Sequence, residues 1–65
     1  MAQFRVTIRY GGRGQRYHVL DVEAETVVGA LRRVVEAFPA EVEPTADLVE
    51  VRLLLEPAER EYGPG

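Results

Sequence analysis

Residues 3–10 restrict the fold of this chain more than any other stretch, because their side chains alternate between apolar and polar. In Gln-Phe-Arg-Val-Thr-Ile-Arg-Tyr, aromatic or aliphatic residues occupy every second position, and arginine or threonine lies between them. This period of two is typical of a β-strand that buries one face. The pattern predicts a strand whose apolar side lies on a hydrophobic core while its arginine-rich side stays open.

A second strand is predicted at residues 16–22, and the length of the loop before it determines which of its faces is buried. A slip of one residue would exchange the two faces. A loop of residues 11–14 would set Phe4 opposite Asp21, whereas a loop of residues 11–15 gives apolar pairs inside and an opposite-charge pair outside. We therefore predict the longer loop. Its inner pairs are Tyr10 with Arg16, Ile8 with His18, Val6 with Leu20 and Phe4 with Val22; its outer pairs are Arg9 with Tyr17, Thr7 with Val19 and Arg5 with Asp21.

The loop itself, Gly-Gly-Arg-Gly-Gln at residues 11–15, combines glycine with arginine and resembles a loop that could hold a phosphate. It lacks the Gly-Lys-Ser/Thr of a P-loop, and no helix start follows it. Glycines are also needed where a short hairpin turn requires positive φ angles. The loop is predicted to be a hairpin turn, with contact to a ligand as the alternative.

A helix is predicted from Thr26, whose hydroxyl is a suitable N-cap, to Ala37 or Phe38, because Pro39 cannot continue it. Gly29 lies in its first turn, where a missing side chain allows close approach to the sheet. The apolar side chains of the helix recur at helical spacing and form one stripe, opposite Arg32, Arg33 and Glu36. The residues of the stripe are Val27, Leu31, Val34, Val35 and Phe38.

An acidic linker with two prolines, residues 39–47, leads to a third predicted strand at 48–55, which Pro57 ends. The strand alternates Val49, Val51, Leu53 and Leu55 with Leu48, Glu50, Arg52 and Leu54. The order strand, strand, helix, strand predicts an α+β two-layer sandwich: a three-stranded antiparallel sheet with strand one central, and one helix over one face. Residues 1–57 are expected to form this single domain, followed by a flexible tail at 58–65.

The size and composition of the chain favour a soluble cytoplasmic protein that associates with itself. A core made by 65 residues supplies only ~3–5 kcal/mol of net stability, and without cysteine there is no disulfide to add to it. Self-association is the remaining source of support. No signal-peptide pattern and no apolar run of ~20 residues is present. Lysine, serine, asparagine and tryptophan are also missing, as in a thermophile-like composition.

The formal charge of −3 is unevenly distributed along the chain. Residues 1–20 carry four arginines and no acid, whereas residues 21–65 carry four arginines and all eleven acids. Such asymmetry indicates either a surface for nucleic acid or a basic element that pairs with an acidic one within the fold.

The residue types that catalysis needs are scarce, so we predict no enzyme, no cofactor and no metal site. Serine and cysteine nucleophiles are absent, and the single histidine, His18, is expected to pack beside Ile8, with a pH-sensitive or ligand-contacting role as the alternative. Four acidic side chains could together approach a hard cation, but their spacing matches no calcium loop. These are Glu41, Glu43, Asp47 and Glu50.

Two surfaces remain as candidates for binding. The open sheet face combines apolar and charged side chains, and we predict that it forms an interface between copies of the chain or with another protein. The third strand is predicted at an edge of the sheet, so two copies could either pair these edges or stack their open faces. The predicted interface residues are Tyr17, Val19, Leu48, Arg52 and Leu54. The alternative is nucleic-acid binding by an arginine-rich hairpin with a stacking aromatic. The residues of this alternative are Arg5, Arg9, Arg13, Arg16 and Tyr17.

Residues 19–28, Val-Leu-Asp-Val-Glu-Ala-Glu-Thr-Val-Val, resemble the second strand and helix entry of ubiquitin-like (β-grasp) domains. The hairpin and helix together, residues 3–38, are similar to small HicB-like antitoxin domains. Both resemblances imply a hairpin-plus-helix fold and binding to a protein partner, not catalysis. Ubiquitin-like sulfur carriers end in an exposed Gly-Gly, whereas this chain ends Tyr-Gly-Pro-Gly, so no functional residue is carried over.

Overall fold

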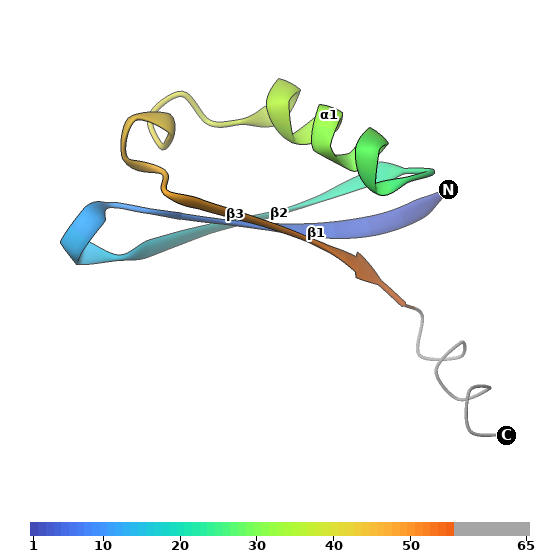
Figure 1. Ribbon diagram of the computed structural model, residues 1–65, viewed down its shortest axis with the longest axis horizontal. Helices are drawn as coiled ribbons and strands as arrows, with labels where there is room; N and C mark the ends of the chain where they lie inside the picture. The colour runs from blue at the N-terminus through green and yellow to red at the C-terminus, as the bar shows by residue number, and fades with distance from the viewer. Residues whose placement is uncertain (56–65) are drawn as a thin grey trace, which may run out of the picture.

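A computed structural model describes residues 1–55 and confirms the predicted α+β fold (Figure 1). Strands β1 (Ala2–Tyr10), β2 (Arg16–Ala24) and β3 (Leu48–Leu54) form an antiparallel sheet in the order β2-β1-β3. Helix α1 (Val27–Ala37) lies over one face of this sheet, which makes two layers. Short 3-10 turns at Gly12–Gly14 and Glu43–Thr45 lie in the connections.

The predicted end of the domain at residue 57 and the predicted tail at 58–65 lie outside the described residues. Within residues 1–55, no helix has the length and apolar content needed to cross a lipid bilayer.

The hairpin has the predicted five-residue loop. Tyr10 pairs with Arg16, and all seven predicted cross-strand pairs between β1 and β2 are present. Gly11 has a φ of 89° and Gly12 a φ of 56°, conformations that favour glycine over residues with a Cβ. The Gly11 N–H also donates to Thr45 Oγ1 at 3.1 Å, which ties the turn to the segment before β3. Gly11 and Gly12 are therefore explained by the backbone of a tight turn.

The core lies between the sheet and α1, and it is small. Among residues 1–55, seven apolar residues are buried, and only Val6 and Ile8 of the large ones are fully enclosed. The central strand supplies three of the seven through its helix-facing side. The buried residues are Phe4, Val6, Ile8, Ala24, Ala30, Val34 and Val42.

Val42 was not expected in the core, because it lies in the segment predicted to be an acidic linker. The side chain is 3% exposed and belongs to the same cluster as Val6, Ile8 and Val34. The flanking Glu41 and Glu43 remain exposed. The connection from α1 to β3 is therefore part of the packed domain.

The ends of α1 agree with the prediction. Thr26 Oγ1 accepts a hydrogen bond from the Gly29 N–H at 3.1 Å and so caps the first turn. The helix ends at Ala37, and Phe38 is extended before Pro39, as its position before proline requires. A Cβ on Gly29 would lie 3.3 Å from the Ala24 Cβ, so the missing side chain allows the first turn to approach β2 closely.

The prediction that the apolar stripe of α1 faces the core is wrong for three of its five residues. Val27, Leu31 and Val35 are 53%, 46% and 77% exposed, whereas Ala30 and Val34 are buried. Successive helical residues are about 100° apart around the helix axis. The predicted stripe therefore lies to one side of the line through Ala30 and Val34, which faces the sheet. The small Ala30 and Gly29 face the sheet instead, because they permit the closer approach.

Candidate functional site

The open face of the sheet carries all five predicted interface residues. Because opposed residues in an antiparallel pair share a face, the pairing of Arg9 with both Tyr17 and Leu48 places these three in one row. Val19, Arg52 and Leu54 lie in the rows of Thr7, Arg5 and Gln3. Tyr17, Val19, Leu48 and Arg52 are exposed, and Leu54 is half-buried.

These residues do not form one continuous apolar patch. The apolar side chains are on the two outer strands, and the polar side of β1 runs between them. Neighbouring strands are ~4.8 Å apart, so Tyr17 and Leu48 lie roughly 10 Å apart with Arg9 between them. The open face therefore has a charged centre and two separate apolar margins.

Two arginines of the open face are held by carboxylates. Arg5 donates to Asp21 through Nε–Oδ1 at 3.0 Å and Nη2–Oδ2 at 3.2 Å. Arg9 donates to Asp47 in the same bidentate manner, at 2.9 Å and 3.3 Å. The Arg5 and Arg9 hydrogen bonds lower the pKa of the Asp21 and Asp47 carboxyls. Part of the charge asymmetry is therefore satisfied by pairing within the fold.

The Arg9–Asp47 pair was missed by the sequence analysis, whereas Arg5–Asp21 follows from the predicted hairpin register. Asp47 immediately precedes Leu48, which lies opposite Arg9. The Asp47 N–H also donates to the Arg9 carbonyl at 3.0 Å. Asp47 could be placed beside Arg9 only once the pairing of β3 with β1 was known.

The four arginines of the nucleic-acid alternative do not share one surface. Arg5 and Arg9 lie on the open face, whereas Arg16 is opposite Tyr10 on the helix side of the sheet. Arg13 lies in the hairpin turn. Neither Arg13 nor Arg16 has an ion pair among the described residues. Of these four arginines, only Arg13 and Arg16, at the end of the hairpin, have no carboxylate partner within residues 1–55.

We expect the Arg5–Asp21 pair to stabilise the fold near neutral pH and to lose this effect at low pH. Its hydrogen bonds hold the pKa of Asp21 below the ordinary value of about 3.9. A carboxyl whose pKa is lower in the folded state adds stability that is complete above its unfolded pKa and disappears as pH falls through the folded pKa. Asp21→Asn should therefore flatten the fall of Tm below about pH 4. Circular dichroism melts from about pH 6 to about pH 3 measure this, with Glu41→Gln as the control; equal slopes in all three proteins would contradict it.

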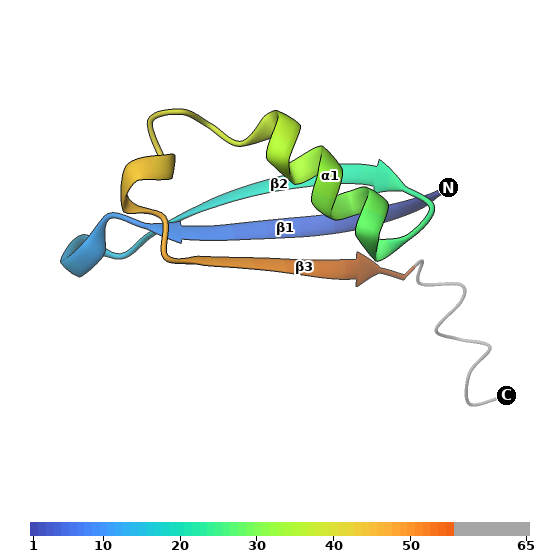
Figure 2. The same ribbon diagram turned by 45° about the horizontal axis from the view of Figure 1, so that its top comes forward.

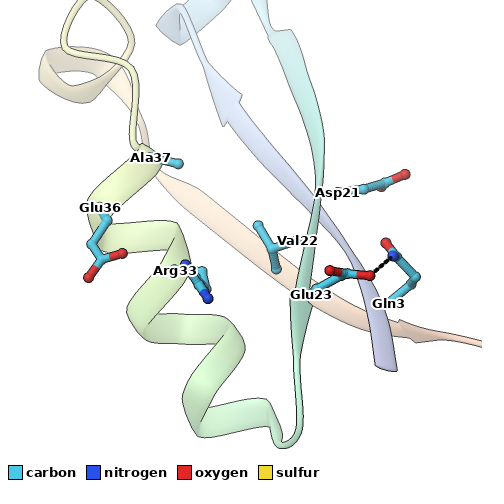
Figure 3. A pocket seen from close by; sticks show the side chains of 7 residues that line it. All are labelled: Gln3, Asp21, Val22, Glu23, Arg33, Glu36 and Ala37. Carbon is cyan, nitrogen blue, oxygen red and sulfur yellow. Dashed lines mark hydrogen bonds between the residues drawn. The ribbon is translucent and has the colours of Figure 1, made fainter. Parts of the chain in front are cut away.

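A hollow of about 510 Å³ lies at the β2 edge of the domain (Figure 3). Val22 and Arg33 approach it from β2 and α1, whereas Asp21 and Glu23 project to the other side of the strand (Figure 3). Gln3 donates to Glu23 at 2.9 Å on that side. The hollow is thus lined by charged side chains that belong to both faces of an exposed sheet edge.

A second hollow, of about 610 Å³, lies on the opposite side of α1 and is more apolar. It is a groove between the end of the helix, the 3-10 turn before β3 and the beginning of β3. The lining residues are Val35, Phe38, Glu43, Ala46, Asp47, Leu48 and Val49. We call it the α1–β3 groove. The groove could not be predicted from the sequence, because helical spacing placed the whole apolar stripe of α1 in the core.

His18 and the four acidic candidates do not gather into a cluster of metal-ligating side chains in the part of the chain that the structure describes. His18 is half-buried opposite Ile8, at its predicted position on the helix side of β2. No three side chains of histidine, aspartate or glutamate come together as metal ligands within residues 1–55.

Comparison of the chain with protein-family models, with curated proteins and with solved structures finds no match. The function is therefore inferred from the chain's own surfaces.

Proposed function

We propose that this chain is a small non-enzymatic protein-interaction module that self-associates. The observation that carries the proposal is the distribution of its apolar side chains. Among residues 1–55, eleven large hydrophobic side chains are exposed, while only seven apolar residues are buried, two of them alanine. Three of the eleven, Val35, Leu48 and Val49, line the α1–β3 groove, and apolar side chains that gather at one place on a surface mark an interaction site.

Self-association would also support a fold with a small core. The chain has no disulfide, and its sheet ends in two outer strands, β2 and β3, whose outward edges no described residue pairs. Edges of this kind readily accept a further strand. Binding that occurs only in the folded state raises stability by mass action, so the domain should become more stable as its concentration rises.

The test is the mass of the protein in solution. We expect light scattering at micromolar concentration to give a mass above the 7.3 kDa of one chain. The melting temperature should rise with protein concentration over the same range, because the associated state is the folded one. A mass of one chain at every concentration, with a constant melting temperature, would refute the proposal.

A nucleic-acid function is the second candidate, and the unpaired arginines of the hairpin end are its only specific support. If it holds, labelled RNA or DNA should be shifted in a salt-sensitive manner, and changing both Arg13 and Arg16 to glutamine should weaken the shift, since fewer phosphate contacts release fewer counterions. Because Arg5 and Arg9 are already bound to carboxylates, we expect no shift at physiological salt. A shift lost in the double variant would make this the preferred function.

A further inference from the structure

We infer that two copies of the chain pair along the outer edge of β3, about a twofold axis at Val51, and that each copy inserts Leu53 into the α1–β3 groove of the other. The inference rests on the proposed self-association and assigns the surface that carries it. Of the two arrangements that the sequence left open, this one pairs the β3 edges and does not stack the open sheet faces.

The first observation is the direction of the apolar stripe on α1. Val35 lines the α1–β3 groove with Val49, whereas Arg33 lines the hollow beside Val22 of β2. The stripe side of the helix is therefore turned toward the β3 side of the domain. Figure 2 shows that β3 forms that edge of the sheet. The helix and the strand thus present exposed apolar side chains around one free edge.

The second observation is the sequence of β3, which is complementary to itself in one register. In a symmetric antiparallel pair, opposed residues share a face, so the twofold axis must set some residue opposite its own copy. An axis at Glu50 or at Arg52 places like charges directly opposite, which is unfavourable. An axis at Val51 sets Glu50 opposite Arg52 of the second copy, twice. The same register sets Val49 opposite Leu53 and Leu48 opposite Leu54, so that apolar residues meet apolar residues throughout.

The charges within one copy favour the same partner. Arg52 lies opposite Arg5 of β1, and its single ion pair among the described residues is with Glu50 of its own strand, at 3.4 Å. Arg5 already binds Asp21. Glu50 of a second copy would give Arg52 a cross-strand carboxylate, which it lacks within residues 1–55.

The third observation is the match between a projecting side chain and a groove. Leu53 is 48% exposed on the helix side of β3, and Val49 on the same side lines the groove. The register centred on Val51 sets Leu53 of the second copy directly beside Val49, at the groove of about 610 Å³. Twofold symmetry repeats this contact at the other end of the strand.

The size of the surface is compatible with a stable dimer. A strand of seven residues is about 24 Å long, and a sheet with one helix above it is about 20 Å high. The projected area of this face is therefore roughly 500 Å². Its accessible surface is larger, because side chains protrude from it, and approaches the ~800 Å² that each partner buries in stable complexes. The β2 edge is a poorer alternative, because the hollow beside it is lined by Asp21, Glu23, Arg33 and Glu36.

A charge exchange tests the register. Glu50→Arg alone and Arg52→Glu alone should each weaken self-association at least about tenfold, because each sets two like-charge pairs across the interface. An equimolar mixture of the two variants should associate again, since each Arg faces a Glu of the other chain. The pairs within each chain stay unfavourable in that mixture, so recovery reports contacts between copies. No weakening in the single variants, or no recovery on mixing, would overturn the Val51 register.

A second experiment tests the groove. Val35→Lys places a charge at a position that is 77% exposed, so the fold should persist by circular dichroism while self-association is lost. Ala40→Lys adds the same charge at another exposed position, so it is the control and should leave the mass unchanged. Association that survives Val35→Lys and is lost in Val19→Lys would show that copies stack through the open face and would overturn this inference alone. A wild-type chain that is monomeric at every concentration would overturn the proposed function as well.

Discussion

Replacing Ile8 by alanine is expected to remove about 2–5 kcal/mol from the free energy of unfolding, which is most of the stability of a domain this small. Ile8 is one of two large side chains with no exposed surface, and it lies on the central strand between His18 and Val49. Truncation removes buried methyl groups and leaves a cavity that a thin two-layer core cannot easily close. Urea unfolding followed by circular dichroism measures the loss.

Two variants serve as controls for Ile8→Ala. Ile8→Val should cost only about 0.5–1.5 kcal/mol, because one methylene is removed. Val19→Ala removes a side chain that is 53% exposed on β2, away from the β3 edge, and should cost less still. All variants must be compared at one protein concentration, since association changes apparent stability. A loss below about 1 kcal/mol for Ile8→Ala would contradict the assignment of the core to this face of β1.

Val42→Asp is expected to cost about 3 kcal/mol or more, because it places a carboxyl in the cluster formed with Val6, Ile8 and Val34. An ionised carboxylate there would have neither a partner nor water, so the folded state would be favoured only with the group protonated. The expected result is a strongly lowered Tm at neutral pH with partial recovery in acid. Thermal melts at about pH 7 and about pH 5 measure both effects.

Ala40→Asp is the matched control for Val42→Asp, since it adds the same charge to the same connection at an exposed position. It should change stability by no more than about 0.5 kcal/mol. If both variants were equally mild, residues 39–47 would behave as the solvated linker that their composition indicated, and the packed connection would be wrong.

Features that depend on neighbouring residues or on adjacent strands could be predicted from the sequence. The alternation in residues 3–10 determined β1 and its buried face, and counting apolar pairs across the glycine loop determined the register of the hairpin. The N-cap at Thr26 and the end of the helix before Pro39 were also predicted from the sequence. Each of these depends on neighbours in the chain, on the period of a strand or on the pairing of adjacent strands.

The rotation of α1, the burial of Val42 and the pairing of Arg9 with Asp47 were decided only by the tertiary structure. Helical periodicity identifies an apolar stripe but not what covers it, and here Ala30 approaches the sheet while Leu31 and Val35 stay exposed. The physical reason is that close approach favours small residues under the helix. The larger ones are left at the edge of β3, where the next surface to meet them belongs, by our inference, to a second copy.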